Sequence, residues 1–120
     1  MQRPKVLQAV FFVTNSGREP VRDWLRELER EDRQEIGSDI LNIECNWPVG
    51  PPHCKPMGRG VYEVRSSLAG GREARVFFLI AGGMLVLLHG FMKKSQKTPE
   101  RELELAQRRK RDWESGYVKE

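Results

Sequence analysis

The first half of the chain has a hydrophobic pattern that predicts one strand followed by two helices. The apolar run over residues 6–14 is typical of a strand, and the Asn-Ser-Gly segment after it ends that strand. Pro20 stands where the first residue of a helix belongs. Apolar residues then recur at helical spacing on one face: Val21, Trp24, Leu25 and Leu28. A second series at this spacing predicts the next helix: Ile36, Ile40, Ile43 and Trp47.

Prolines and glycines divide the second half into short β-type runs and a final helix. Four prolines between residues 47 and 56 predict an irregular loop. A turn is expected at residues 69–71, and Gly82-Gly83 predicts a two-residue hairpin turn. Thr98, followed by proline, is a good N-cap for a helix that ends near Trp113. Strands are predicted in the remaining apolar runs: residues 62–66, 73–81 and 84–92.

The order β-α-α-β-β-β-α predicts an α+β fold. We expect a small twisted antiparallel sheet with an N-terminal helical hairpin packed on it and a C-terminal helix. The 120 residues suffice for one hydrophobic core, and the sequence has no internal repeat or linker. The whole chain, residues 1–120, is therefore expected to form a single domain.

The sequence favours a reduced, cytoplasmic setting without a membrane partner. Cys45 and Cys54 form no CxxC motif, and residues 1–20 lack the apolar core of a secretory signal. The apolar stretch over residues 76–92 is too short to span a bilayer, and a glycine pair interrupts it. The spacing of the two cysteines and two histidines fits no common zinc site, so no metal or cofactor is expected.

Charge is unevenly distributed along the chain. The net charge is only +4, but residues 19–44 hold nine acids and four bases. Residues 93–111 hold eight bases and three acids, and residues 55–97 hold eight bases and two acids. This segregation indicates that one side of the protein faces nucleic acid.

Several cations lie inside or at the ends of the predicted strands: Arg65, Arg75, Lys93 and Lys94. Burying an unpaired cation is expensive, so such residues either pair with acids or face a polyanion. If the Gly82-Gly83 hairpin has its simplest register, Arg75 lies opposite Gly90, and Lys94 continues the same face. A glycine opposite an arginine would leave room for a ligand to approach the sheet.

Strand adjacency predicts that Arg65, Arg75 and Lys94 converge, with Lys93 and Lys97 nearby. The alternative is that Arg75 pairs with an acid, Glu63 or Glu73. In that case Lys93 and Lys94 would only be solvent-exposed residues at the end of a strand. The excess of cations over acids favours anion binding for the group rather than for any one residue.

Three segments, YEVR, GGREARVFF and LLHGFMKKSQKTPERELELA, resemble the RelE/ParE toxin superfamily, and especially its HigB-like, phage-related branch. The specific match covers residues 62–106. The resemblance implies a RelE-like fold and the toxin of a type II toxin–antitoxin pair. Such a toxin would be a ribosome-dependent mRNA endoribonuclease, neutralised by a cognate helix-turn-helix antitoxin. Cleavage would proceed by attack of the RNA 2′-OH, without a metal.

The resemblance places the catalytic cations at Arg75, Arg65, Lys94 and Lys93. We expect Arg75 to be the main clamp on the transition state and Arg65 to help it, because a guanidinium can bind a phosphate in bidentate fashion. Further contacts to RNA phosphates are expected from other basic residues: Lys55, Lys97, Arg101, Arg108 and Arg109.

The proton-transfer group is not identified by the sequence. The functional tyrosine that RelE has after the last strand has no counterpart here, and neither His53 nor His89 aligns convincingly with a family histidine. A lysine whose pKa is lowered by neighbouring cations is one possibility. Two other functions stay open: a ParE-like gyrase inhibitor, and a non-enzymatic phage-related protein that binds nucleic acid or a partner.

Overall fold

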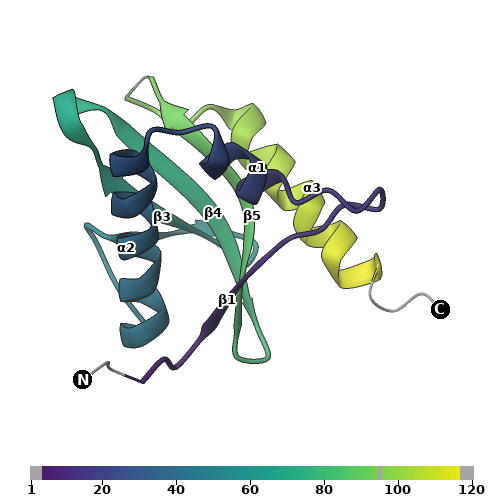
Figure 1. Cartoon of the computed structure of the whole chain (residues 1–120). Coiled ribbons are helices and arrows are strands. Elements are labelled where there is room, and N and C mark those ends of the chain that lie inside the picture. The colour runs from purple at the N-terminus through teal and green to yellow at the C-terminus, as the bar shows by residue number, and fades with distance from the viewer. Residues whose placement is uncertain (1–3, 95, 117–120) are drawn as a thin grey trace.

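The computed structural model describes residues 4–94 and 96–116 and has the predicted α+β architecture (Figure 1). The helices and strands of this part of the chain follow one another in this order: β1 (Gln8–Phe11), α1 (Pro20–Arg26), α2 (Arg30–Asn46), β2 (Cys54–Gly58), β3 (Val61–Ser67), the 3-10 turn η1 (Ala69–Gly71), β4 (Glu73–Ala81), β5 (Met84–Lys93) and α3 (Glu100–Gly116). None of the described helices is long and apolar enough to cross a bilayer.

The sheet has five strands in the order β1-β5-β4-β3-β2 and is mixed rather than wholly antiparallel. β1 runs parallel to β5, whereas the other pairs are antiparallel. β2 lies in a segment that the sequence predicted to be loop up to Pro56. Proline is tolerated there because β2 is an edge strand, so one side of its backbone needs no partner.

The two faces of the sheet are covered by different helices (Figure 1). On one face, α2 packs Ile36, Ile40 and Ile43 into a core shared with β3 and β4, and α1 adds Val21. On the other face, α3 packs against the sheet through Ala106, Leu103 and Trp113. Successive residues of β4 alternate between these two cores, as a strand buried on both faces requires.

The hairpin of β4 and β5 begins in the predicted register, with Ala81 opposite Met84, and then shifts by one residue. A bulge between Phe77 and Phe78 leaves Leu88 as an extra residue on β5. Arg75 therefore lies opposite Phe91, and the predicted pairing of Arg75 with Gly90 is wrong. The same shift makes Lys93, which pairs with Glu73, continue the face of Arg75 in place of the predicted Lys94.

Gly90 serves the packing of α1 rather than the approach of a ligand. A Cβ atom at this position would lie 2.5 Å from two ring atoms of Trp24, Cε3 and Cζ3. The indole thus packs directly on the backbone of β5, and only glycine leaves room for it.

We predict that Gly90→Ala lowers the free energy of unfolding by about 1–3 kcal/mol, because the new methyl group forces Trp24 out of its place. Gly37→Ala is the matched control, since Gly37 is exposed in α2 and a Cβ atom at this position would have no neighbouring atom within 4 Å. That substitution should stabilise the protein by about 1 kcal/mol through helix propensity. Urea unfolding measures both changes, and equal effects would contradict the packing of Trp24 on Gly90.

Candidate functional site

Strand pairing brings charged residues into three rows on the α3 face of the sheet. The outer row, at the end of the strands, joins Ser67, Glu73 and Lys93. The middle row joins Arg65, Arg75 and Phe91. The inner row joins Lys55, Glu63, Phe77 and His89.

The middle row confirms that Arg65 and Arg75 are direct cross-strand neighbours. His53 extends this row beyond Arg65, because its carbonyl oxygen accepts a hydrogen bond from the Arg65 N–H at 3.0 Å. These three side chains line one small pocket of about 290 Å³, together with Pro52, Ser67 and Glu73. We call it the arginine pocket.

Arg75 is almost completely buried, with 3% of its surface exposed. Its Nη2 donates to Glu73 Oε1 at 2.6 Å, and its Nη1 donates to the Ala74 carbonyl at 3.0 Å. Its Nε lies 3.7 Å from Glu63 Oε1 and has no hydrogen-bond partner in the described part of the chain. The structure thus confirms the alternative in which Arg75 pairs with an acid, and Arg75 contacts both Glu63 and Glu73.

Arg65 is the accessible arginine of the pair. One third of its side chain is exposed, and its Nε lies 3.5 Å from Glu63 Oε1. Glu63 itself is 1% exposed and stands between both arginines. The Thr98 hydroxyl donates to its other oxygen, Oε2, at 3.3 Å, which ties the segment before α3 to the sheet.

The lysines at the end of β5 form a second pocket beside the first. Lys93 and Lys94 line it with Gly71, Glu73 and Gln96, and its volume is about 350 Å³. The Lys93 ammonium donates to the Gln96 carbonyl at 2.7 Å. We call this the lysine pocket. Glu73 belongs to both pockets, and its pKa is lowered, chiefly by its hydrogen bond from Arg75 and also by Lys93 and Arg65.

An ion pair with α2 fixes the turn that leads into these pockets. Arg72 donates from both terminal nitrogens to the Asp32 carboxylate, at 2.8 and 2.9 Å, and from Nε to the Ala69 carbonyl at 2.9 Å. The pKa of Asp32 is lowered by this contact. Because Arg72 directly precedes Glu73, its ion pair with Asp32 fixes the position at which β4 begins.

His89 anchors α3 to the sheet and lines neither pocket. Its Nε2 contacts Glu102, and Arg109 Nη1 donates toward its Nδ1 at 3.4 Å. Since arginine can only donate, Nδ1 is the acceptor and Nε2 carries the proton given to Glu102. Burial lowers the pKa of His89 and outweighs the opposite effect of Glu102.

The other predicted RNA contacts differ in how accessible they are. Lys55, Lys97, Arg101 and Arg108 are exposed. Arg109 is partly buried: its Nη1 donates to the Leu88 carbonyl at 2.8 Å, and burial lowers its pKa. Leu88 is the bulge residue, so Arg109 satisfies a carbonyl at a position where the strand ladder is interrupted. Its position gives Arg109 a structural role.

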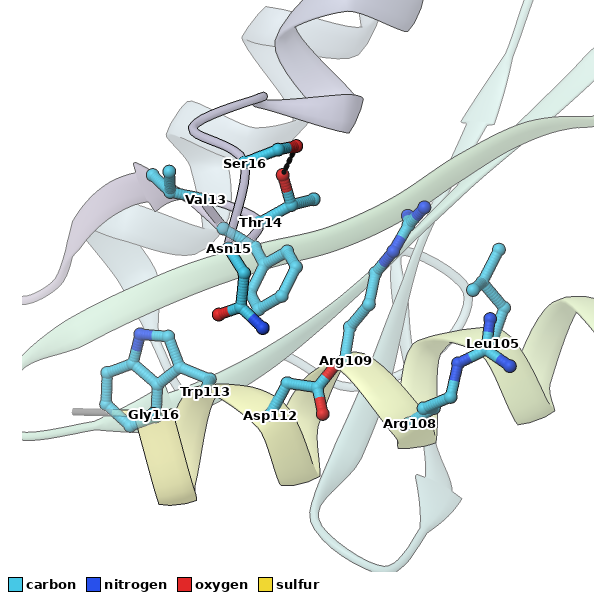
Figure 2. A pocket seen from close by; sticks show the side chains of 11 residues that line it. Val13, Thr14, Asn15, Ser16, Leu105, Arg108, Arg109, Asp112, Trp113 and Gly116 are labelled. Carbon is cyan, nitrogen blue, oxygen red and sulfur yellow. Dashed lines mark hydrogen bonds between the residues drawn. The ribbon is translucent and has the colours of Figure 1, made fainter. Parts of the chain in front are cut away.

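A larger hollow of about 690 Å³ lies between α3 and the segment after β1 (Figure 2). Trp113, Arg108 and Arg109 line one side of it, and residues 12–16 line the other. None of the four predicted catalytic cations lines this hollow.

Sequence reasoning missed the place of His53. The proline-rich segment around it predicted an irregular loop, which gave no cross-strand neighbour for the imidazole. The signal that could have found it is the register of the unpredicted strand β2, because Cys54 pairs with Val64 and so brings His53 beside Arg65.

The fold and the cation-lined sheet face define a small α+β protein of the RelE-like type. The chain matches the family model of the phage-derived protein Gp49-like (DUF891) over residues 23–111, about three quarters of its length, and it belongs to that family. This is a RelE/HigB-like toxin family of toxin–antitoxin systems, so the chain is toxin-like and its family indicates an antitoxin partner. No curated protein matches the chain.

Burial separates the two arginines in their effect on stability. Arg75→Ala should lower the free energy of unfolding by about 3–5 kcal/mol, because it removes a buried partner of the buried Glu63. Arg65→Ala should lower it by less than about 1 kcal/mol, because Arg65 is partly solvated. Chemical denaturation of both variants measures the difference. Equal losses would show that Glu63 depends on the two arginines alike.

Proposed function

We propose that this protein is the toxin of a type II toxin–antitoxin pair and cleaves mRNA on the ribosome. The observation that carries the proposal is the arginine pocket, where Arg65, Arg75 and His53 meet beside the two lysines of the neighbouring pocket. Phosphate-binding cations and a side chain able to transfer protons are the two parts that metal-free RNA cleavage needs.

In this mechanism the RNA 2′-oxygen attacks the adjacent phosphorus and the bond to the 5′-oxygen breaks. The products are a 2′,3′-cyclic phosphate and a 5′-hydroxyl. The attacking hydroxyl loses a proton, the leaving oxygen gains one, and the phosphorane carries added negative charge. The protein must therefore align the strand, stabilise that charge and move two protons.

We assign the first contact with the phosphate to Arg65, because its guanidinium is exposed, and place Arg75 behind it. This order reverses the expectation that Arg75 is the main clamp. Arg75 supports the phosphate from the floor of the pocket, where its burial keeps water away and strengthens each hydrogen bond to the added charge.

We assign proton transfer to His53, which supplies the imidazole of the arginine pocket. It is placed beside Arg65 by a backbone hydrogen bond rather than by its own ring, which leaves the ring to act on the substrate. Lys93 and Lys94 would hold the backbone next to the cleaved bond.

Exposed basic residues extend this surface beyond the two pockets. Lys55 lies on the same sheet face, in the row next to Arg65. Lys97, Arg101 and Arg108 continue it along the approach to α3 and on α3 itself. In the proposal these residues hold mRNA or ribosomal RNA phosphates without reading sequence.

A second candidate is a protein of the same family that binds nucleic acid or a partner without cutting RNA. The observation that favours it is the double pairing of Arg75 with Glu63 and Glu73, which neutralises the arginine in the unliganded protein. Growth arrest without new RNA ends would support this candidate, or a gyrase inhibitor, over the nuclease.

The test is induced expression of the wild type, Arg65→Ala and His53→Gln, followed by primer extension on a translated message. We expect new 5′ ends with the wild type and a loss of cleavage on the order of 100-fold in either variant. Arg22→Ala is the matched control, because Arg22 is an exposed arginine of α1 paired with Glu19 on the opposite face of the sheet. Full cleavage by Arg65→Ala would exclude the assigned site.

A further inference from the structure

The carboxylate of Glu73 stands where the arginine pocket and the lysine pocket meet. It lines both, and its Oε1 accepts a 2.6 Å hydrogen bond from Arg75 Nη2. Half of its side chain, 49%, is exposed, in contrast to the buried arginine that it contacts. Lys93 lies directly opposite Glu73 on β5.

This contact resembles the one that a phosphate would make. A carboxylate oxygen and a phosphate oxygen accept the same charge-assisted hydrogen bonds from a guanidinium. The other two nitrogens of Arg75 face the protein, because Nη1 donates to the Ala74 carbonyl and the buried Nε lies 3.7 Å from Glu63 Oε1. An anion that enters the arginine pocket therefore meets Glu73 as its competitor for Arg75.

The two acids near Arg75 differ in whether they can leave. Glu63 is 1% exposed and is held by Arg65, Arg75 and Thr98. Glu73 is half-solvated, so its side chain can turn into water at little cost in desolvation. Arg75 would stay in place when Glu73 leaves, because Glu63 and the Ala74 carbonyl still hold it.

We propose that Glu73 holds the place of a substrate phosphate on Arg75, and that a single RNA strand displaces it to bind across both pockets. Displacement removes the anion between the pockets, so successive phosphates can contact Arg65 and Arg75 on one side and Lys93 and Lys94 on the other. The inference rests on the proposed function in taking RNA as the polyanion.

The experiment measures binding of a single-stranded RNA oligonucleotide whose 2′-oxygens are methylated, so that it cannot be cleaved by 2′-OH attack. We expect Glu73→Gln to bind it roughly 3- to 10-fold more tightly than the wild type, because the amide no longer competes as an anion for Arg75.

Glu114→Gln is the matched control. Glu114 is also about half exposed, at 52%, and accepts a 2.7 Å hydrogen bond from a cation, Lys110, on α3. Its substitution changes the net charge by the same amount, and we expect binding within about twofold of the wild type. Equal affinities of Glu73→Gln and Glu114→Gln would overturn the proposal.

A second comparison tests whether Glu73 acts through Arg75. In an Arg75→Lys background, which keeps the charge but loses the guanidinium fork, Glu73→Gln should tighten binding by less than about twofold. A full gain in that background would show a general charge effect and would also overturn the proposal. Circular dichroism and thermal unfolding establish that each variant is folded.

The methylated probe separates this inference from the nuclease proposal. If no cleavage is found but Glu73→Gln still binds more tightly, the place-holding role stands for an RNA-binding protein. If cleavage is found and Glu73→Gln binds like Glu114→Gln, the place-holding role fails and the nuclease stands.

Discussion

The buried pair of Glu63 and Arg75 is the interaction on which the rest of the site depends. Neither charge could be taken out of water alone, and each is buried because the other is present. Glu63 joins β3 to β4 through Arg75 and to the segment before α3 through Thr98, and it also contacts Arg65 on its own strand. Burial, reinforced by Glu63, also raises the pKa of Cys54 to about 11, so this thiol stays protonated near neutrality.

This arrangement explains how a small sheet can carry so many cations. The local acids are few, but strand pairing sets both of them on the face that carries the arginines, Glu63 in the inner row and Glu73 in the outer row. The outcome is a graded site rather than a uniformly basic patch. Arg75 is neutralised and buried, Arg65 is partly paired and accessible, and Lys94 is exposed.

Much of the fold follows from local signals that the sequence carries. β4 has the predicted bounds, and the Gly82-Gly83 turn sets Ala81 against Met84 as expected. The missed features are those that only tertiary contacts define. β2 follows a proline-rich segment, whose composition predicts a loop rather than a strand. The bulge at Leu88 lies in an apolar stretch in which no residue type marks its position. Arg109, 21 residues further along the chain, satisfies the Leu88 carbonyl.

The bulge changes the neighbour of Arg75 on β5 but not the face of the sheet on which Arg75 lies. The face of Arg75 depends only on alternation along β4, where Phe77 and Leu79 share the α3 side, and a shift on β5 does not alter it. Its neighbour on β5 depends on every residue between the turn and the pair, so one extra residue replaces Gly90 with Phe91. Convergence of Arg65 and Arg75 was therefore predictable, because no bulge separates β3 from β4. Their unequal exposure was not, because it depends on where distant acids and the loop at Thr98 come to lie.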